Sequence, residues 1–158
     1  MKINKLELKN IKYIASMHEE TPCYKADIFI NGKKAIRVSN HGHGACDDHY
    51  PLDPFTYEDV KNLEKYLAKL QDDDFEPIDS WCHDRLYEYL DQKKIKRDMK
   101  TKFICINKNT NELFAYEKNT GISDSAFQDH MDKNHPSSMC LNFLPFDQAW
   151  KLFDGATS

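Results

Sequence analysis

The segment from Ala26 to Val38 constrains the fold more than any other part of this sequence. It holds two short, mostly apolar segments, 26–30 and 35–38, with Asn31-Gly32 between them. Asn-Gly is a strong signal for a tight turn because both residues tolerate positive φ angles. The pattern predicts a β-hairpin, and the polar-apolar alternation of residues 5–9 predicts a strand before it. We therefore expect three antiparallel strands before Asn40.

Two amphipathic helices are predicted next. The first begins at Thr56, and four apolar residues at helical spacing form its core face. These are Val60, Leu63, Leu67 and Leu70. The second helix begins at Asp79 or Ser80 and ends near the basic run 93–97, which we interpret as a solvated helix end.

The pattern of the remaining residues predicts a second hairpin, with strands over 101–106 and 112–117. It also predicts a helix over 123–131, a strand over 139–143 and a closing helix over 146–153. The order is βββ-αα-ββ-α-β-α, so the predicted fold class is α+β with a mainly antiparallel sheet. At 158 residues the chain has the usual size of one domain. We therefore predict a single domain over 1–158.

Composition bears on location. The apolar runs are far shorter than the roughly 20 residues that cross a bilayer, and the N-terminus has no apolar segment followed by a cleavage site. The 5 cysteines are an odd number, which favours free thiols or metal ligands over a disulfide framework. We expect a protein of a reducing cytoplasm, with Cys105 in the core.

The formal net charge is −4, from 26 acidic and 22 basic side chains. Nucleic-acid binders concentrate an excess of Lys and Arg, so the whole-chain charge favours a basic protein partner and no direct contact with nucleic acid. The acidic run Asp72, Asp73 and Asp74 is the predicted partner-binding segment. The alternative interpretation is a solvated acidic surface.

The loop 40–51 is rich in His, Cys and Asp and is the candidate functional site. Zinc needs four nitrogen, sulfur or carboxylate donors, and the spacing of Cys46 and His49 lets one turn direct both at one ion. Glycines around His43 allow it to approach as well, and Cys82 and His83 at the start of the second helix are the best distant donors. The predicted metal ligands are thus His43, Cys46, His49, Cys82 and His83, with zinc as the cofactor.

Two other interpretations of this loop stay open. It can be an exposed polar turn with Cys82 packed as a small hydrophobe, and no metal at all. It can also be a catalytic metal centre with one position open for water and Asp47 or Asp48 as the base, in a metal-dependent hydrolase or nuclease. The motifs of common hydrolase, phosphate-binding and dinucleotide-binding sites are absent, so we expect a protein that is not an enzyme.

Several segments resemble uncharacterised small proteins of phages, prophages and other mobile elements. They are 9–13, 19–23, 38–44 and the C-terminal 140–145. Residues 45–49 depart from those proteins, which continue with Gly-Gly and a different His spacing. In size, acidity and possible zinc, the chain is also similar to some anti-CRISPR proteins. That resemblance implies an inhibitor of a single-chain RNA-guided CRISPR nuclease in a bacterial host cell, which blocks loading of DNA.

Overall fold

The structure is a computed structural model that describes residues 2–118 and 121–157. It confirms the predicted α+β class, with a four-stranded and a three-stranded antiparallel sheet. The chain forms two compact units, residues 1–89 and 90–158. The prediction of one domain over 1–158 stays a prediction, and each unit is described by itself. In the described part of the chain, no helix has the length and apolar character needed to span a membrane.

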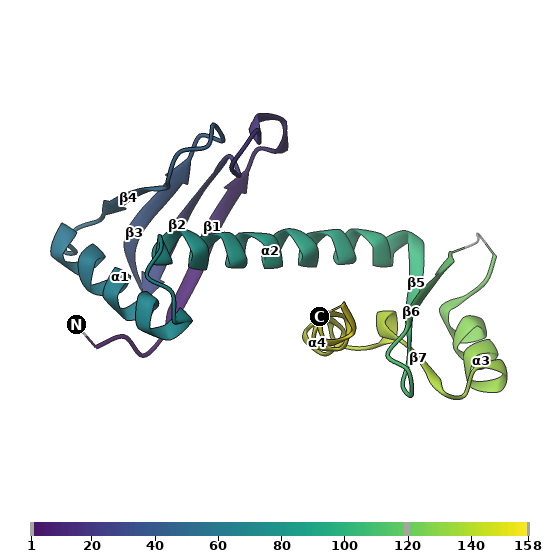
Figure 1. Cartoon of the computed structure of the whole chain (residues 1–158). Coiled ribbons are helices and arrows are strands. Elements are labelled where there is room, and N and C mark those ends of the chain that lie inside the picture. The colour runs from purple at the N-terminus through teal and green to yellow at the C-terminus, as the bar shows by residue number, and fades with distance from the viewer. Residues whose placement is uncertain (1, 119–120, 158) are drawn as a thin grey trace. The chain divides into compact units, whose positions relative to one another are not determined.

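Four strands form the sheet of the first unit, in the order β1-β2-β3-β4 (Figure 1). They are β1 (Leu6–Tyr13), β2 (Tyr24–Ile30), β3 (Lys33–Asn40) and β4 (Asp48–Pro51). The predicted hairpin is confirmed, and both Asn31 and Gly32 have positive φ angles in its turn. The strand β4 was not predicted: the loop after Asn40 returns and pairs with β3, which places His49 opposite Val38.

The sheet contains one buried charge. Asp27 on β2 accepts one hydrogen bond from the Asn10 side chain and pairs with Lys34 and Arg37. Asn10 lies at a register shift of β1 with a φ angle of 55°. Burial raises the pKa of the Asp27 carboxyl, but the hydrogen bonds from Asn10 and Lys34 outweigh it and leave the pKa below its ordinary 3.8.

Two helices follow the sheet: α1 (Tyr57–Gln71) and α2 (Pro77–Thr101). Thr56 precedes α1, and the Asp59 carboxylate accepts hydrogen bonds from its N–H and hydroxyl groups, which fixes the start of the helix. Leu63 and Leu67 are fully buried as predicted, but Leu70 is 62% exposed. It lies at the last turn, next to Asp72, whose left-handed backbone ends the helix.

The helix α2 is longer than predicted at both ends. It begins at Pro77, which suits the first helical position because its missing N–H has no partner there. It continues past 93–97 because Ile95 and Met99 extend the apolar side into the core of the second unit. In the first unit, Ile78, Cys82 and Leu86 form a buried stripe at intervals of four residues.

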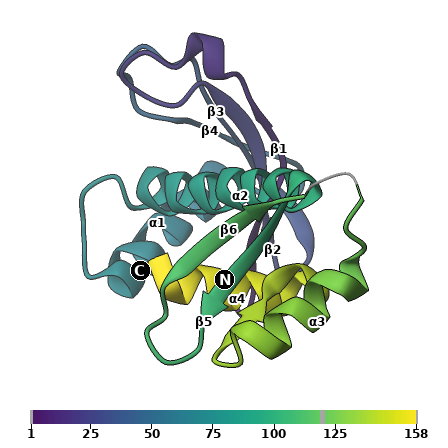
Figure 2. The same ribbon diagram turned by 90° about the vertical axis from the view of Figure 1, so that its right-hand side faces the viewer.

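The second unit is a three-stranded sheet with helices on both faces (Figures 1 and 2). Its elements are β5 (Lys102–Asn107), β6 (Leu113–Glu117), α3 (Asp124–Asn134), β7 (Ser138–Cys140) and α4 (Phe146–Thr157). The predicted strand 139–143 is only partly correct, because 141–143 form a 3-10 turn.

Side chains on both faces of the central strand β5 pack in apolar clusters. Phe103 and Cys105 join α3 in one apolar cluster, which confirms Cys105 as a core residue. Ile104 and Ile106 join α4 and the end of α2 in another. Beside the strand, the Asn142 side chain accepts a hydrogen bond from Ile104 N–H at 2.8 Å and donates to the carbonyls of Met99 and Lys102.

Candidate metal centre

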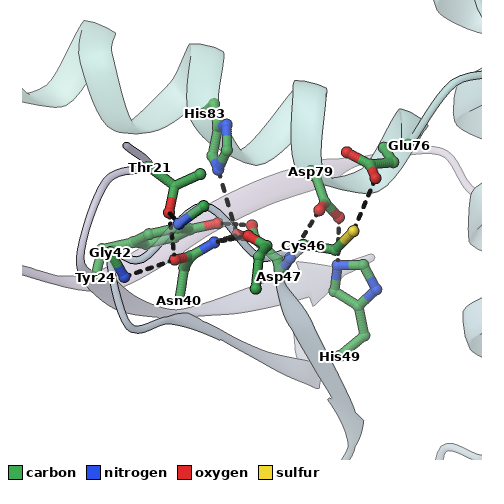
Figure 3. A network of polar contacts seen from close by, with 12 residues as sticks. Thr21, Tyr24, Asn40, Gly42, Cys46, Asp47, His49, Glu76, Asp79 and His83 are labelled. Carbon is green, nitrogen blue, oxygen red and sulfur yellow. Dashed lines mark hydrogen bonds and ion pairs between the residues drawn. The ribbon is translucent and has the colours of Figure 1, made fainter. Parts of the chain in front are cut away.

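The candidate site lies entirely in the first unit, where the loop between β3 and β4 meets the first turns of α2 (Figure 3). The loop supplies Cys46 and Asp47, and β4 supplies His49. The helix α2, with the residue before it, supplies Glu76, Asp79 and His83. Asp79 and His83 are four residues apart, so they project from one side of the helix. The neighbouring stripe of Ile78, Cys82 and Leu86 holds that side of α2 in place by its burial.

Asn40, at the end of β3, determines the shape of the loop. Its side-chain oxygen accepts hydrogen bonds from the Thr21 hydroxyl and the Gly42 N–H, both at 2.8 Å. Its amide nitrogen donates to the Ala45 carbonyl at 2.8 Å and to Asp47 Oδ1 at 2.9 Å. All four interactions of one buried amide thus hold the loop against the sheet.

Gly42 has a structural requirement of its own. Its φ angle is +89°, and a Cβ atom there would overlap the backbone carbonyl oxygen of Met17. That close approach lets the Gly42 carbonyl accept hydrogen bonds from the N–H groups of Glu19 and Glu20. Glycine is therefore required here for both backbone angle and space.

Asp47 is a buried carboxylate with several partners. Tyr24 donates a short hydrogen bond to Oδ2, and His83 Nε2 lies 3.3 Å from Oδ1. Burial raises the pKa of Asp47, but hydrogen bonds from His83, Tyr24 and Asn40 outweigh it and lower the pKa. The hydrogen bond to Asp47 raises the pKa of His83, so the two groups stabilise each other in charged form. Burial raises the pKa of Tyr24, which stays a neutral donor.

Asp79 is the second buried carboxylate of this site and the centre of the candidate metal site. Its Oδ2 accepts a hydrogen bond from Asp47 N–H at 2.8 Å, and its Oδ1 lies 2.9 Å from His49 Nε2. His49 Nε2 is itself buried, and the geometry of that contact is not that of a hydrogen bond. A buried ring nitrogen without a hydrogen-bond partner needs an explanation, and a bound cation is one way to satisfy it.

Two groups of three side chains have donor atoms that all lie within 4.8 Å of one another. One group is Cys46, Glu76 and Asp79, and the other is Asp47, His49 and Asp79. Asp79 belongs to both. Ligands lie about 2.0–2.3 Å from zinc, so two ligand atoms on one ion are separated by no more than about 4.6 Å. The first group offers sulfur and carboxylate donors, and the second offers nitrogen and carboxylate donors.

Of the five predicted ligands, Cys46 and His49 belong to these groups. Within 2–118 and 121–157, the groups that could hold an ion do not include His43, Cys82 or His83. His43 is exposed and lies 3.0 Å from Glu19, whereas His83 pairs with Asp47. Cys82 is fully buried, and burial raises the pKa of its thiol well above the ordinary value.

Sequence reasoning did not identify Glu76 and Asp79 as candidate ligands. Both lie about thirty residues from the loop, and Asp79 was interpreted as the start of the second helix, three and four residues before Cys82 and His83. A signal was available in the helix pattern, because Ile78, Cys82 and Leu86 define the buried stripe and leave Asp79 and His83 on the adjacent side.

A scan against protein-family models and searches of curated proteins and of solved structures found no match. The resemblance to proteins of mobile elements therefore stays a prediction.

Proposed function

We propose that the first unit is a zinc-binding module in which Cys46, His49, Glu76 and Asp79 hold one ion. The observation that carries the proposal is the convergence of a thiol from the loop and an imidazole from β4 on Asp79 at the start of α2. Zinc accepts sulfur, nitrogen and oxygen donors together in one tetrahedral site. With four protein ligands the site is closed and structural, and it joins the loop to the helix.

The hydrogen bond between Cys46 and Glu76 supports the assignment of both residues as zinc ligands. The Cys46 thiol donates a hydrogen bond to Glu76 at 2.8 Å, and that hydrogen bond raises the pKa of the thiol. Zinc binds the thiolate and the neutral imidazole, so it replaces the thiol proton, and binding releases protons. We expect zinc affinity to rise with pH as the thiol proton becomes easier to remove.

The test is metal content measured together with thermal stability. Cys46→Ala and His49→Ala should each lower bound zinc, measured by elemental analysis, and lower the Tm as well. His43→Ala is the matched control, because His43 lies in the same loop and contacts Glu19 instead. Full zinc content and an unchanged Tm in both ligand variants would exclude the assignment.

The same measurement separates a structural site from a catalytic one. Glu76→Gln should lower zinc content if the site is closed by four protein ligands. A site held by Asp47, His49 and Asp79 with water in the fourth position would keep its zinc in that variant and would favour the metal-dependent hydrolase or nuclease. The contacts of Asp47 favour the closed site, because both of its oxygens already accept hydrogen bonds.

For the biological role, we propose that the protein is an inhibitor of a host defence nuclease in the bacterial cytoplasm, of the anti-CRISPR type. One structural observation favours a binding role: Asp72, Asp73 and Asp74 are all exposed, and Phe75 beside them is 74% exposed. An aromatic side chain next to three carboxylates suits a partner surface with basic residues around an apolar contact. The DNA channel of an RNA-guided nuclease offers such a basic surface.

This role is tested by pull-down with single-chain RNA-guided nucleases and by their binding of target DNA. Changing Asp72, Asp73 and Asp74 to Lys should abolish capture, and added salt should weaken it because screening reduces steering by charge. The matched control changes the three exposed residues Asp124, Asp129 and Asp132 to Lys, which alters net charge equally. Unchanged DNA binding by the nucleases with the protein in excess would refute the role.

A further inference from the structure

The positive charge of this chain is concentrated in one segment of the second unit. Five of the eight residues from 93 to 100 are basic, and only Asp98 among them is acidic. By contrast, the first 89 residues hold 12 basic and 17 acidic side chains. The whole-chain charge of −4 therefore conceals a local excess of the opposite sign.

These basic residues lie on one side of α2. At 3.6 residues per turn, Lys93, Lys94 and Arg97 share a helix face with Lys96 and Lys100 that spans roughly 160° of the circumference. All five are exposed. Ile95 and Met99 lie on the opposite side and pack in the apolar core. The helix thus presents its basic face to solvent from a fixed backbone.

A shallow groove of about 520 Å³ runs along this face. Its lining consists of Leu90 and the same five basic residues: Lys93, Lys94, Lys96, Arg97 and Lys100. All six residues belong to α2, so the hollow lies between side chains of one helix face. A cluster of charges of one sign raises the local concentration of counter-ions.

Two structural explanations account for only part of this arrangement. Cations at a helix C-terminus offset the helix dipole, but that effect is confined to the last turn and does not reach Lys94. Arg97 lies 3.7 Å from Asp98, and such an exposed ion pair contributes little to stability. Lys96 lies 4.2 Å from the centre of the Phe146 ring, which orients the ammonium group without neutralising it.

We propose that this face of α2 binds the phosphate backbone of nucleic acid without sequence preference. Duplex DNA carries one negative charge per about 1.7 Å of its axis, and the segment 93–100 is about 10 Å long. The phosphates along this length of duplex are therefore dense enough to contact all five basic side chains at once. An extended acidic peptide is less dense, with at most one charge per roughly 3.3 Å. The proposal is independent of the zinc site and of the acidic segment.

The test is fluorescence anisotropy with a labelled DNA duplex of about 20 base pairs, measured across a range of salt concentrations. Five phosphate contacts predict that log K falls with log salt with a slope of about −4.5, or roughly a 500-fold loss of affinity between 50 and 200 mM salt. The variant Lys94→Ala, Arg97→Ala, Lys100→Ala should reduce the slope to about −1.8 and the loss to roughly 12-fold.

The matched control is Lys61→Ala, Lys65→Ala, Lys69→Ala on α1, because these residues are equally exposed and the change in net charge is the same. It should bind like the parent. Single-stranded RNA of the same length is a second probe. Loss of binding in the α2 variant, with DNA or with RNA, supports the proposal. Polyglutamate of equal charge is the third probe. Equal affinity for polyglutamate, a slope near zero, or an α2 variant that binds like the parent would each overturn the proposal.

Discussion

Replacing Asn40 by Ala tests whether one amide determines the shape of the candidate site. The side chain is 4% exposed and takes part in four hydrogen bonds, two as acceptor and two as donor. Each contributes about 0.5–1.5 kcal/mol net, and the loss leaves partners such as the Gly42 N–H without a replacement. We expect a loss of about 3 kcal/mol in the free energy of unfolding of the first unit, or roughly a 150-fold change in its equilibrium constant.

The assay is denaturation by urea followed by the fluorescence of Trp81, which is buried in the first unit. Trp150 lies in the second unit, so the parent and the variant should both carry Trp150→Phe to leave a single reporter. The measurement is made on protein treated with a chelator, so that metal content does not contribute.

Asn4→Ala is the control, since Asn4 is exposed at the beginning of the same unit. Surface substitutions of this kind change stability by no more than about 0.5 kcal/mol. A loss below about 1 kcal/mol for Asn40→Ala, comparable with the control, would refute the reasoning, because it would mean that water replaces the amide at little cost.

Three further predictions concern the first unit. Leu63→Ala should lower the free energy of unfolding by about 2–5 kcal/mol in urea denaturation, because Leu63 is fully buried and its loss leaves a cavity. A smaller effect would show that neighbouring side chains move in and fill that cavity. Gly42→Ala should lower the Tm far more than Gly32→Ala, because both have positive φ but only Gly42 faces a backbone oxygen; equal losses would exclude the clash. Asp27 has a lowered pKa, so its stabilising contribution is present above pH 3.8 and is lost as the pH falls through the folded value. The gap in stability between the parent and Asp27→Asn should therefore close in acid, and a gap that persists there would contradict this account.

The sequence predicted the elements whose signals are local. The hairpin over 26–38 follows from Asn31-Gly32 between apolar runs, and the start of α1 follows from Thr56 and the acidic residues after it. The strand β4 escaped prediction because Asp48-His49-Tyr50-Pro51 has little strand character of its own. It is a strand because it pairs with β3, and a single-sequence pattern does not record such a partner.

The candidate site was predicted only in its loop half, for the same reason. Cys46 and His49 are three residues apart, so their proximity follows from the chain itself. Glu76 and Asp79 approach them only after α2 has packed on the sheet through its buried stripe. Cys82 and His83, the donors expected from α2, have other roles, since one lies in that stripe and the other pairs with Asp47.

The central strand of the second unit raises a question of alignment. Most sheets have one apolar and one polar face, so a slip of one residue exposes the core side and is strongly disfavoured. Both faces of β5 are apolar, and a slip would exchange Phe103 and Cys105 for Ile104 and Ile106 at little hydrophobic cost. The three hydrogen bonds of Asn142 to the backbone at 99, 102 and 104 exist in one alignment only. A single polar side chain thus supplies the uniqueness that hydrophobic patterning provides in other sheets.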